Sequence, residues 1–356
     1  MPGLVGGFGN YFLPIHCGSP DMAKINLEFY HYNSIKNIAT LIKNNSSSLL
    51  LNLSNNDKQE ELRLNKEYDN KNEVNNKYLK SYLAGLFEGD GHIWIPNSNL
   101  KKKHNPRFCI TFNLKNEPLA KLLVEIIGYG HIRYKPKDNA CVLIVSPVKG
   151  LKKIIKLING ELKTPKLHQL HKLIDWINTN HKINFKNLSF NNESLDKNSW
   201  LSGFVDADGS FSIRMSHLEN KDKKRQISCR LRVEQRMVDP ITNIPYFDSL
   251  NKIATFFNCN LLIRKQKTSG NNYYHLTASS CKSIQIILNY FDSYPLYSSK
   301  YLDYKDWAEA ANIILEQTQY RDENIIKIKN LKNNMNNSRV YFNWSHLINL
   351  RKTPII

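Results

Sequence analysis

The sequence predicts an α+β protein of two pseudo-symmetric repeats, each with the element order α-β-β-α-β-β-α plus one extra helix, and each carrying an antiparallel sheet. Residues 83–91 read LAGLFEGDG and residues 201–209 read LSGFVDADG, so an apolar helix that ends in Asp-Gly occurs twice. The same succession of helical and strand patterns follows both copies. Strands that alternate between apolar and polar residues predict sheets with one face on helices and one in solvent.

The amino-acid composition limits the classes of protein to which the chain can belong. The 356 residues are 41% hydrophobic, which is enough for two cores. Lys and Arg number 50 against 31 Asp and Glu, and the net charge of +19 indicates a polyanionic partner, although a Lys- and Asn-rich genome would give the same excess without function. The six cysteines form no C-x-x-C pair, so we expect reduced thiols rather than a zinc knuckle or a disulfide framework. No membrane span or secretory signal is expected.

Changes in composition divide the chain around the repeats. A Gly- and Pro-rich start and a polar, low-complexity linker precede the first repeat, a second polar linker separates the repeats, and a basic tail without an assigned place follows. The boundaries are 1–23 for the start, 24–75 for the first linker, 76–180 for repeat one, 181–198 for the second linker, 199–317 for repeat two and 318–356 for the tail.

Each repeat continues from its motif helix, which begins near Lys80 in the first copy, through two strands, a middle helix, two more strands and two further helices. In repeat one we expect strands at 91–95, 107–114, 131–135 and 140–145, and helices at 117–127, 148–158 and 166–179. In repeat two we expect strands at 210–217, 226–235, 260–267 and 271–278, and helices at 245–257, 280–290 and 298–316.

Each motif helix carries small residues on one face. Gly85 and Gly89 lie four residues apart, and Gly203 and Ala207 hold the same places in the second copy. Small residues at this spacing let two helix backbones approach closely, by sterics best attested in membranes. We therefore expect the two motif helices to pack against each other on a pseudo-twofold axis.

The motif helices end in Asp90 and Asp208, which would meet on that axis. Gly91 and Gly209 follow them and suit the left-handed residue that ends a helix. A carboxylate at the negative end of a helix dipole is unfavourable, and two neighbouring carboxylates repel each other. A divalent cation would relieve both problems, and hard oxygen ligands with open positions for water and phosphate suit Mg²⁺.

Two further acids, Glu88 and Asp206, precede these carboxylates by two residues. They lie roughly 200° around the helix, so we interpret them as structural rather than as members of the same site. One Asp-Gly after an apolar helix is a common helix end, and that is the alternative for each copy. The repetition of the motif together with its small-residue pair favours function.

The polar faces of the strands are rich in Arg, Gln, Ser and Asn, which are residue types that contact phosphates and base edges. An ordinary solvated sheet face is the alternative, but arginines at several places rather than a Lys/Glu mixture favour nucleic acid. The predicted contact residues of repeat one are His92, Trp94, Arg107, Thr111, Asn113, Arg133 and Lys135. Those of repeat two are Ser210, Ser212, Arg214, Ser216, Gln226, Ser228, Arg230, Arg232, Arg264, Gln266, Tyr273 and His275.

With these motifs the chain resembles the LAGLIDADG homing endonucleases in their single-chain, double-motif form, over about residues 76–317. Both repeats also end alike, with ELKTPKLHQLHKLIDW at 161–176 and YPLYSSKYLDYKDW at 294–307. This places Lys166 and Lys300 where a basic residue of the family lies near the scissile phosphates; solvated lysines are the alternative. The first motif departs from the family name at Glu88 and Gly89, neither of which is a metal acid.

The resemblance implies that the chain is an endonuclease with a DNA-binding saddle formed by its two sheets. Two or three divalent ions, Mg²⁺ in our expectation, would be shared between the repeats and held by Asp90 and Asp208 with the backbone carbonyls near Gly89 and Ala207. The metals would activate water and stabilise the leaving oxygen. A monomer would then hydrolyse both strands of double-stranded DNA across the minor groove and leave short 3′ overhangs.

One more pair of residues follows from the resemblance. Asn116 and Gln235 stand at the start of the two middle helices, spaced almost as the motifs are. The family often has a polar residue there that organises water. We therefore include both residues in the predicted catalytic set, which is Asp90, Asp208, Lys166, Lys300, Asn116 and Gln235.

The chief alternative is an RNA maturase that assists the splicing of its host intron, either instead of or besides cleaving DNA. Host intron RNA would then be a second partner, and the basic tail at 318–356 is a candidate surface for it. A DNA-binding regulator with a relic of the fold is a third alternative. We would expect a regulator to have lost one metal acid, whereas both Asp90 and Asp208 are present.

The N-terminus carries a separate resemblance. The segment that opens with MPGLVGGFGNYFLP and continues to CGSPDM is similar to a region of the largest subunit of cytochrome c oxidase, and the similarity breaks off near Ala23. This implies an upstream exon read in frame into an intron-encoded protein. The gene would then lie in a mitochondrial intron and the protein in the mitochondrial matrix, which explains why no Arg-rich transit peptide is visible.

Overall fold

The structure of the chain is a computed structural model, and it describes residues 77–97, 104–216, 226–265 and 270–351. All of these residues belong to one compact unit that spans Lys71–Ile356. The segments predicted at 1–23 and 24–75, and the predicted contact residue Gln266, lie outside the described residues.

The two motif helices pack against each other at the centre of this unit. The first spans residues 77–90 and the second, α7, spans Trp200–Asp208. A Cβ atom on Gly85 would lie 1.9 Å from the Trp200 carbonyl oxygen, and one on Gly203 would lie 2.0 Å from the Tyr82 carbonyl oxygen. The predicted close approach through small residues is therefore confirmed, because no side chain fits at either glycine.

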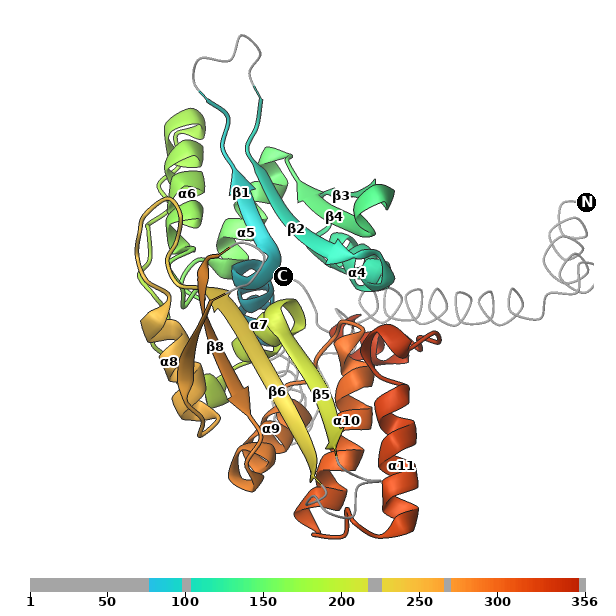
Figure 1. Cartoon of the computed structure of the whole chain (residues 1–356). Helices are drawn as coiled ribbons and strands as arrows, with labels where there is room; N and C mark the ends of the chain where they lie inside the picture. The colour runs from blue at the N-terminus through green and yellow to red at the C-terminus, as the bar shows by residue number, and fades with distance from the viewer. Residues whose placement is uncertain (1–76, 98–103, 217–225, 266–269, 352–356) are drawn as a thin grey trace, which may run out of the picture. The chain divides into compact units, whose positions relative to one another are not determined.

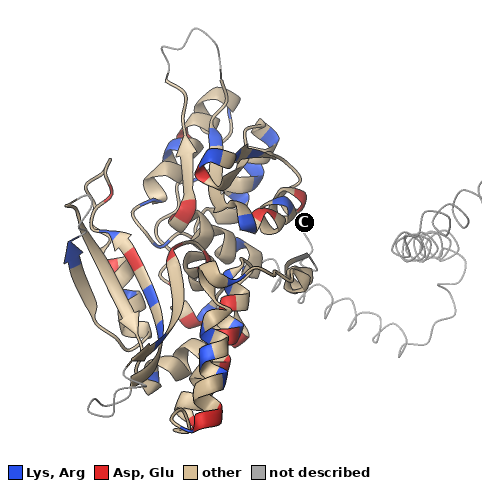
Figure 2. Ribbon diagram, turned by 45° about the vertical axis from the view of Figure 1, so that its right-hand side comes forward, with Lys and Arg blue, Asp and Glu red and all other residues tan. Residues whose placement is uncertain are grey.

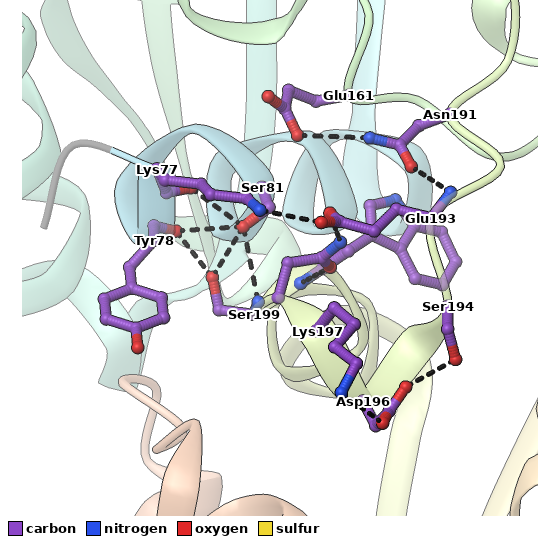
Figure 3. A network of polar contacts seen from close by, with 12 residues as sticks. Lys77, Tyr78, Ser81, Glu161, Asn191, Glu193, Ser194, Asp196, Lys197 and Ser199 are labelled. Atoms are coloured by element: carbon purple, nitrogen blue, oxygen red, sulfur yellow. Dashed lines mark hydrogen bonds and ion pairs between the residues drawn. The ribbon is translucent and has the colours of Figure 1, made fainter. Parts of the chain in front are cut away.

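The pseudo-twofold axis passes between two serines at the start of these helices. The hydroxyls of Ser81 and Ser199, which hold matching positions, lie 2.9 Å apart and are buried. The Ser199 hydroxyl also donates to the Tyr78 carbonyl oxygen (Figure 3). Each helix thus meets its counterpart through the same residues on both sides.

The glycines after the two carboxylates do not end the helices in a left-handed conformation, so that prediction was wrong. Gly209 has φ −82° and ψ 158°, and it begins a strand, as Gly91 does. A Cβ on Gly91 would lie 2.6 Å from the Phe87 carbonyl oxygen, and one on Gly209 would lie 2.8 Å from that of Val205. Glycine is required there because the chain folds back tightly on the last helical turn.

Repeat one forms a four-stranded antiparallel sheet in the order β1-β2-β4-β3 (Figure 1). Helices α4, α5 and α6 complete the repeat, and α4 contacts β2, β3 and β4 while α6 contacts β1. The strands are β1 Gly91–Trp94, β2 Arg107–Asn113, β3 His131–Lys135 and β4 Ala140–Val145, and the helices are α4 Glu117–Ile127, α5 Val148–Ile158 and α6 Leu167–His181.

Repeat two forms a second sheet of the same topology, β5-β6-β8-β7. Its strands are β5 Gly209–Ser216, β6 Gln226–Arg236, β7 Leu261–Lys265 and β8 Asn272–Ala278, and its helices after α7 are α8 Phe247–Phe256, α9 Cys281–Ser293 and α10 Lys300–Leu315. The predicted order of elements is confirmed in both repeats, with ends that differ by a few residues. One of the larger differences is in α9, which continues past residue 290 because Phe291 extends its buried face.

The tail that had no predicted place packs on repeat two. Its helix α11, Asp322–Asn333, contacts α10 and β5 (Figure 1). Further along, Arg339 forms ion pairs with Asp303 at 3.1 Å and with Asp306. The His346 ring stacks on Tyr301 with 4.2 Å between centroids. This part of the tail is therefore a structural element of the second half rather than a free basic extension.

The linker between the repeats also fastens to the body. The amide of Asn191 donates to the Leu162 carbonyl oxygen at 2.7 Å, and Glu193 accepts a hydrogen bond from Lys77 at 2.7 Å (Figure 3). No helix among the described residues combines the length and apolarity that crossing a membrane requires.

Candidate active site

The two motif carboxylates face each other where the motif helices end. Burial raises the pKa of the Asp208 carboxyl to about 7, and the neighbouring charge of Asp90 is the second cause. Burial also raises the pKa of Asp90, although this residue keeps contact with solvent and the lysines Lys300 and Lys166 lower it. The predicted encounter of the two acids on the axis is thus present, and it is electrostatically unfavourable without a cation.

Two lysines lie against the backbone at the ends of the motif helices. The Lys166 Nζ donates to the Gly89 carbonyl oxygen at 2.8 Å and to the Gly91 carbonyl oxygen at 3.0 Å. The Lys300 Nζ donates to the Ala207 carbonyl oxygen at 2.6 Å. A cation at this position offsets the negative end of the helix dipole. Burial lowers the pKa of both lysines, while the nearby carboxylates oppose that shift.

Each lysine serves the carboxylate of the other repeat. The Lys166 Nζ is hydrogen-bonded to the end of the first motif helix, and both lysines lower the pKa of both carboxyls. The Asp208 Oδ2 atom also approaches the first motif helix, since a Cβ on Gly89 would lie only 3.2 Å from it. The site therefore consists of two centres, each built from both repeats. We call them the Asp208 centre, with Lys166, and the Asp90 centre, with Lys300.

Gln235 and Asn116 do not occupy matching places. The Gln235 Nε2 donates to the Asp208 Oδ2 at 2.7 Å, so this residue belongs to the Asp208 centre. The Asn116 Oδ1 instead accepts from the Ser299 backbone amide at 2.9 Å, next to Lys300, and no hydrogen bond joins it to Asp90. Asn116 thus supports the start of α10, and its predicted equivalence to Gln235 was wrong.

Glu88 and Asp206, the two acids that we interpreted as structural, bind the loops that carry Lys166 and Lys300. Glu88 accepts hydrogen bonds from the Thr164 backbone amide and hydroxyl, both at 2.6 Å, two residues before Lys166. Asp206 accepts from the Ser298 amide at 3.1 Å and from its hydroxyl at 2.5 Å, two residues before Lys300. Both acids are buried. They therefore fix the lysines relative to the motif helices in the same way in both halves.

The same acids tie the two repeats together. Glu88 accepts a hydrogen bond from the Trp200 indole at 2.6 Å, and Asp206 accepts one from the Tyr82 hydroxyl at 2.8 Å. Tyr82 and Trp200 hold matching positions in the two motif helices, so each acid is bound by the opposite helix. This arrangement couples the geometry of one lysine loop to the helix of the other repeat.

The donors at the axis fit a hard divalent cation. The described residues contain no group of three or more His, Cys, Asp and Glu side chains that could enclose a metal ion. The candidate donors are instead the carboxylates of Asp90 and Asp208 and the carbonyl oxygens of Gly89 and Ala207. An all-oxygen set with few protein ligands suits Mg²⁺, which usually keeps several waters or binds substrate phosphate.

The raised pKa of Asp208 predicts a pH-dependent gain in stability for the Asp208→Asn variant in metal-free buffer. Because the folded-state pKa of about 7 exceeds the ordinary value of 3.8, the folded protein binds this proton more tightly, and its stability falls as pH rises between those values. Asparagine does not ionise. Thermal unfolding should show the variant equal to the parent near pH 4 and more stable at pH 8, by about 1–2 kcal/mol after allowance for solvent contact. A difference independent of pH would contradict the prediction.

The predicted contact residues within the described part of the chain share one face of each sheet. In sheet one, Trp94 pairs with Arg107, and Thr111 and Arg133 both pair with Val142. In sheet two, Ser212 pairs with Arg230 and Ser210 with Arg232. Side chains directly opposite each other in a sheet lie on the same face, so the alternation in the sequence correctly placed these residues on a common face of each sheet. Figure 2 shows Lys and Arg on strands and helices alike, so the sheets do not hold all of the positive charge.

The polar face of sheet one has an apolar floor that the alternation did not predict. Cys109, Val142 and Ile144 are buried on this face and form a small cluster of their own. Trp94 and Arg107 lie at its rim, with the guanidinium 5.0 Å from the ring centroid. β4 is an inner strand with apolar residues on both of its faces, so its continuous apolar run carries no signal for which face is wet.

Several residues on the same faces were missed. His131 pairs with Ile144, and Thr277 pairs with Arg232, so both lie among the predicted contacts. The alternation did contain a signal for both, because His131 lies two residues before Arg133 and Thr277 lies two residues after His275. Glu234 also lies on this face, where it forms an ion pair with Arg264 at 3.3 Å and places a negative charge among the arginines.

The sequence profile described as LAGLIDADG endonuclease matches residues 83–179 and 201–311. These ranges hold both sheets, both axis carboxylates and both lysines. The chain therefore belongs to the LAGLIDADG endonuclease family.

Relatives with curated descriptions agree with this membership. The intron-encoded DNA endonuclease aI3 of Saccharomyces cerevisiae is 31% identical over 316 residues, which cover 80% of this chain and 75% of the relative. A 37.2 kDa cox1 intron-2 protein of Schizosaccharomyces pombe is 30% identical over 72% of each chain. The intron-encoded RNA maturase bI4 of S. cerevisiae is 25% identical over 72% of this chain and 36% of the maturase.

Solved structures share the fold. The I-SmaMI LAGLIDADG homing endonuclease bound to cleaved DNA matches with a TM-score of 0.57 and 20% identity, over 73% of this chain and 98% of that one. The same enzyme bound to uncleaved DNA in the presence of calcium ions matches with a TM-score of 0.53 and 20% identity, over 72% and 98% of the two chains. The predicted α+β fold of two pseudo-symmetric repeats is confirmed.

Proposed function

We propose that this chain is a site-specific endonuclease that cuts both strands of a DNA duplex and so promotes the homing of the intron that encodes it. The observation that carries the proposal is the pair of facing carboxylates, Asp90 and Asp208, each served by a lysine from the opposite repeat. A helix end with only a structural role would need neither a second carboxylate nor a lysine from the opposite repeat. The endonuclease aI3 of yeast, 31% identical, supports the same activity.

The carboxylates and the lysines of the site would have different roles in the hydrolysis. Asp90 and Asp208, with the Gly89 and Ala207 carbonyls, would hold Mg²⁺. When bound, divalent ions supply an activated water and stabilise the leaving oxygen. The lysine ammonium groups would stabilise the charge that develops on the phosphate in the transition state. Because the lysines donate to the same carbonyl oxygens in this structure, we expect them to exchange those contacts for phosphate when DNA and metal are present.

The two polar sheet faces would bind the DNA duplex on either side of the cut. Phosphate contacts from their arginines and lysines supply most of the affinity and make it fall steeply with salt. Both halves of the site lie in one chain, so we infer that the protein acts as a monomer. The cleavage site then need not be a palindrome, because the two sheets carry different side chains.

Arg230 offers a test of base reading. Its side chain lies on the polar face of β6. Arg230 pairs with Ser212 of β5, and its Nε donates to the Ser228 hydroxyl. We expect Arg230→Ala to weaken specific binding by about 1–3 kcal/mol if the guanidinium contacts a guanine, and to relax the preference at one position of the target. Selection from a randomised DNA library would measure the profile. An unchanged profile with a smaller salt dependence would assign Arg230 to phosphate instead.

The similarity of residues 1–23 to the largest subunit of cytochrome c oxidase, together with the cox1 intron relative, supports a mitochondrial cox1 intron as the source and the matrix as the location. The intronless exon junction is then the natural target. Purified protein should cut a duplex that spans this junction at one place when Mg²⁺ is present and not when EDTA replaces it. Cutting that survives EDTA, or no cutting of any junction duplex, would overturn the proposal.

A maturase role is a second candidate, favoured by the similarity to the RNA maturase bI4, of which this chain covers about a third. The predicted surface in the tail is partly committed to the fold, since Arg339 is bound to Asp303 and Asp306. Binding of the intron RNA that survives competition by the DNA target would support a separate RNA surface. Loss of RNA binding under that competition would place both nucleic acids on the sheets.

A further inference from the structure

The two centres of the site are not equally equipped. Strand register places residues of the two sheets in correspondence, because Gly91 pairs with Ile110 as Gly209 pairs with Val233. The residue two positions after Val233 is Gln235, which holds Asp208. The residue two positions after Ile110 is Phe112. Its side chain is 4% exposed and belongs to the hydrophobic core.

The Asp90 centre therefore lacks a matching donor. Among the described residues, no hydrogen bond reaches the Asp90 carboxylate; burial raises its pKa, and Lys300 and Lys166 lower it. Asn116, the other amide in that region, is turned toward the Ser299 backbone. The carboxylate of Asp90 is also more open to solvent than that of Asp208. Its orientation is consequently less restrained.

The residue that follows Gln235 in β6 adds to the difference between the Asp208 centre and the Asp90 centre. Arg236 follows Gln235, lies beside Lys166 in the recess next to the Asp208 centre, and lowers the pKa of Asp208. Asn113 holds the corresponding place in β2 and carries no charge. The Arg236 backbone amide also donates to the Gln235 Oε1 at 3.0 Å, which orients the amide group so that its NH₂ faces Asp208. Held donors of this kind preorganise a charged group before the reaction.

We propose that the two strands of the DNA are cut in a fixed order, with the strand at the Asp208 centre cut first, and that Gln235 is the positioning residue responsible. This inference rests on the proposed endonuclease function. A preoriented carboxylate at one centre and a less restrained one at the other give unequal barriers for two otherwise similar hydrolyses. The protein would then release or hold a nicked duplex as an intermediate on the way to the double-strand break.

Single-turnover cleavage of a duplex labelled differently on each strand tests the order. We expect one strand to be cut about tenfold faster or more, which corresponds to the effect of one positioned group. Gln235→Leu should slow that strand by at least about tenfold and leave the other strand within about twofold. Leucine is a suitable replacement because Phe112, at the corresponding position of repeat one, shows that an apolar side chain can pack at this point of the sheet. Gln285→Leu, on the exposed face of α9, is the matched control and should change neither rate.

Rescue by a conservative variant gives a readout that a general loss of structure would not move. The Gln235 Nε2 donates to the Asp208 Oδ2 at 2.7 Å, and asparagine keeps an NH₂ donor at the same position. Gln235→Asn should therefore restore part of the rate on the first strand that Gln235→Leu removes. The rate on the second strand should be the same in both variants, and failure of asparagine to restore any rate would overturn the role of the donor.

The outcomes separate the inference from the function on which it rests. Equal rates on the two strands in the parent, or an equal loss on both strands in Gln235→Leu, would overturn the fixed order while the endonuclease stands. Slowing of only the strand that the parent cuts second would overturn the assignment of Gln235. Absence of any cut in either strand by the parent would remove the proposed function itself.

Discussion

Replacing Asp208 by asparagine should abolish cleavage of both strands and leave DNA binding largely intact. The change removes one of the two carboxylates that we propose to hold metal at the axis, and the second centre shares the same group of charges. We expect the single-turnover rate to fall by about a thousandfold or more. Under the proposed function, affinity resides mainly in the sheet faces and their phosphate contacts, so the dissociation constant in calcium buffer should change little.

The control for this variant is Asp248→Asn. Asp248 lies exposed in the first turn of α8 and lacks any link to the axis, so its loss should alter neither the rate nor the affinity. Retained cleavage by Asp208→Asn would remove Asp208 from the site. Lost binding would mean instead that the carboxylate holds the two repeats in register.

Gly203→Ala should prevent stable folding. The added Cβ would lie 2.0 Å from the Tyr82 carbonyl oxygen and 2.7 Å from the Leu86 backbone nitrogen, and rigid backbone on the opposite motif helix cannot move aside as a side chain could. Separating the helices would open the centre of the core. We expect a loss of about 3 kcal/mol or more in the free energy of unfolding, measurable as a fall of about 10 °C in the unfolding temperature or as insoluble protein.

Gly270→Ala is the comparison that isolates sterics from glycine's conformational freedom. Gly270 has φ +71°, and a Cβ added there would meet no atom within 4 Å, so alanine should cost only about 1 kcal/mol for the left-handed backbone. Similar losses in the two variants would show that helix contact is not what Gly203 provides.

The repeated elements and the axis carboxylates could be predicted from the sequence because two copies of one pattern check each other. The positions of the glycines in the motif helices follow from helical geometry alone, and so does the wet face of each strand. Gln235 also carried a signal, since it stands on the apolar face of β6, after Leu231 and Val233, where a polar side chain breaks the alternation.

Other features depend on tertiary contacts that no local pattern encodes. Asn116 and Gln235 have matching sequence positions only if the strands before them have equal length, whereas β2 ends at Asn113 and β6 runs on to Arg236. Gly91 and Gly209 are followed by strands, and whether such a glycine is left-handed or extended depends on how the chain continues. The place of the tail also depends on such contacts, because Arg339 forms ion pairs with Asp303 and Asp306 while Ile328 and Met335 are buried in the core.

The central claim is that two carboxylates from one chain meet on the axis and cut both DNA strands close together. The most direct measurement is to map both cut ends, at nucleotide resolution, on the exon-junction duplex after reaction with Mg²⁺. Two cuts a few base pairs apart across the minor groove, leaving a short 3′ overhang, are the predicted result, and both should vanish in Asp208→Asn. Cuts far apart, a 5′ overhang, or ends unchanged in the variant would contradict a shared centre at Asp90 and Asp208.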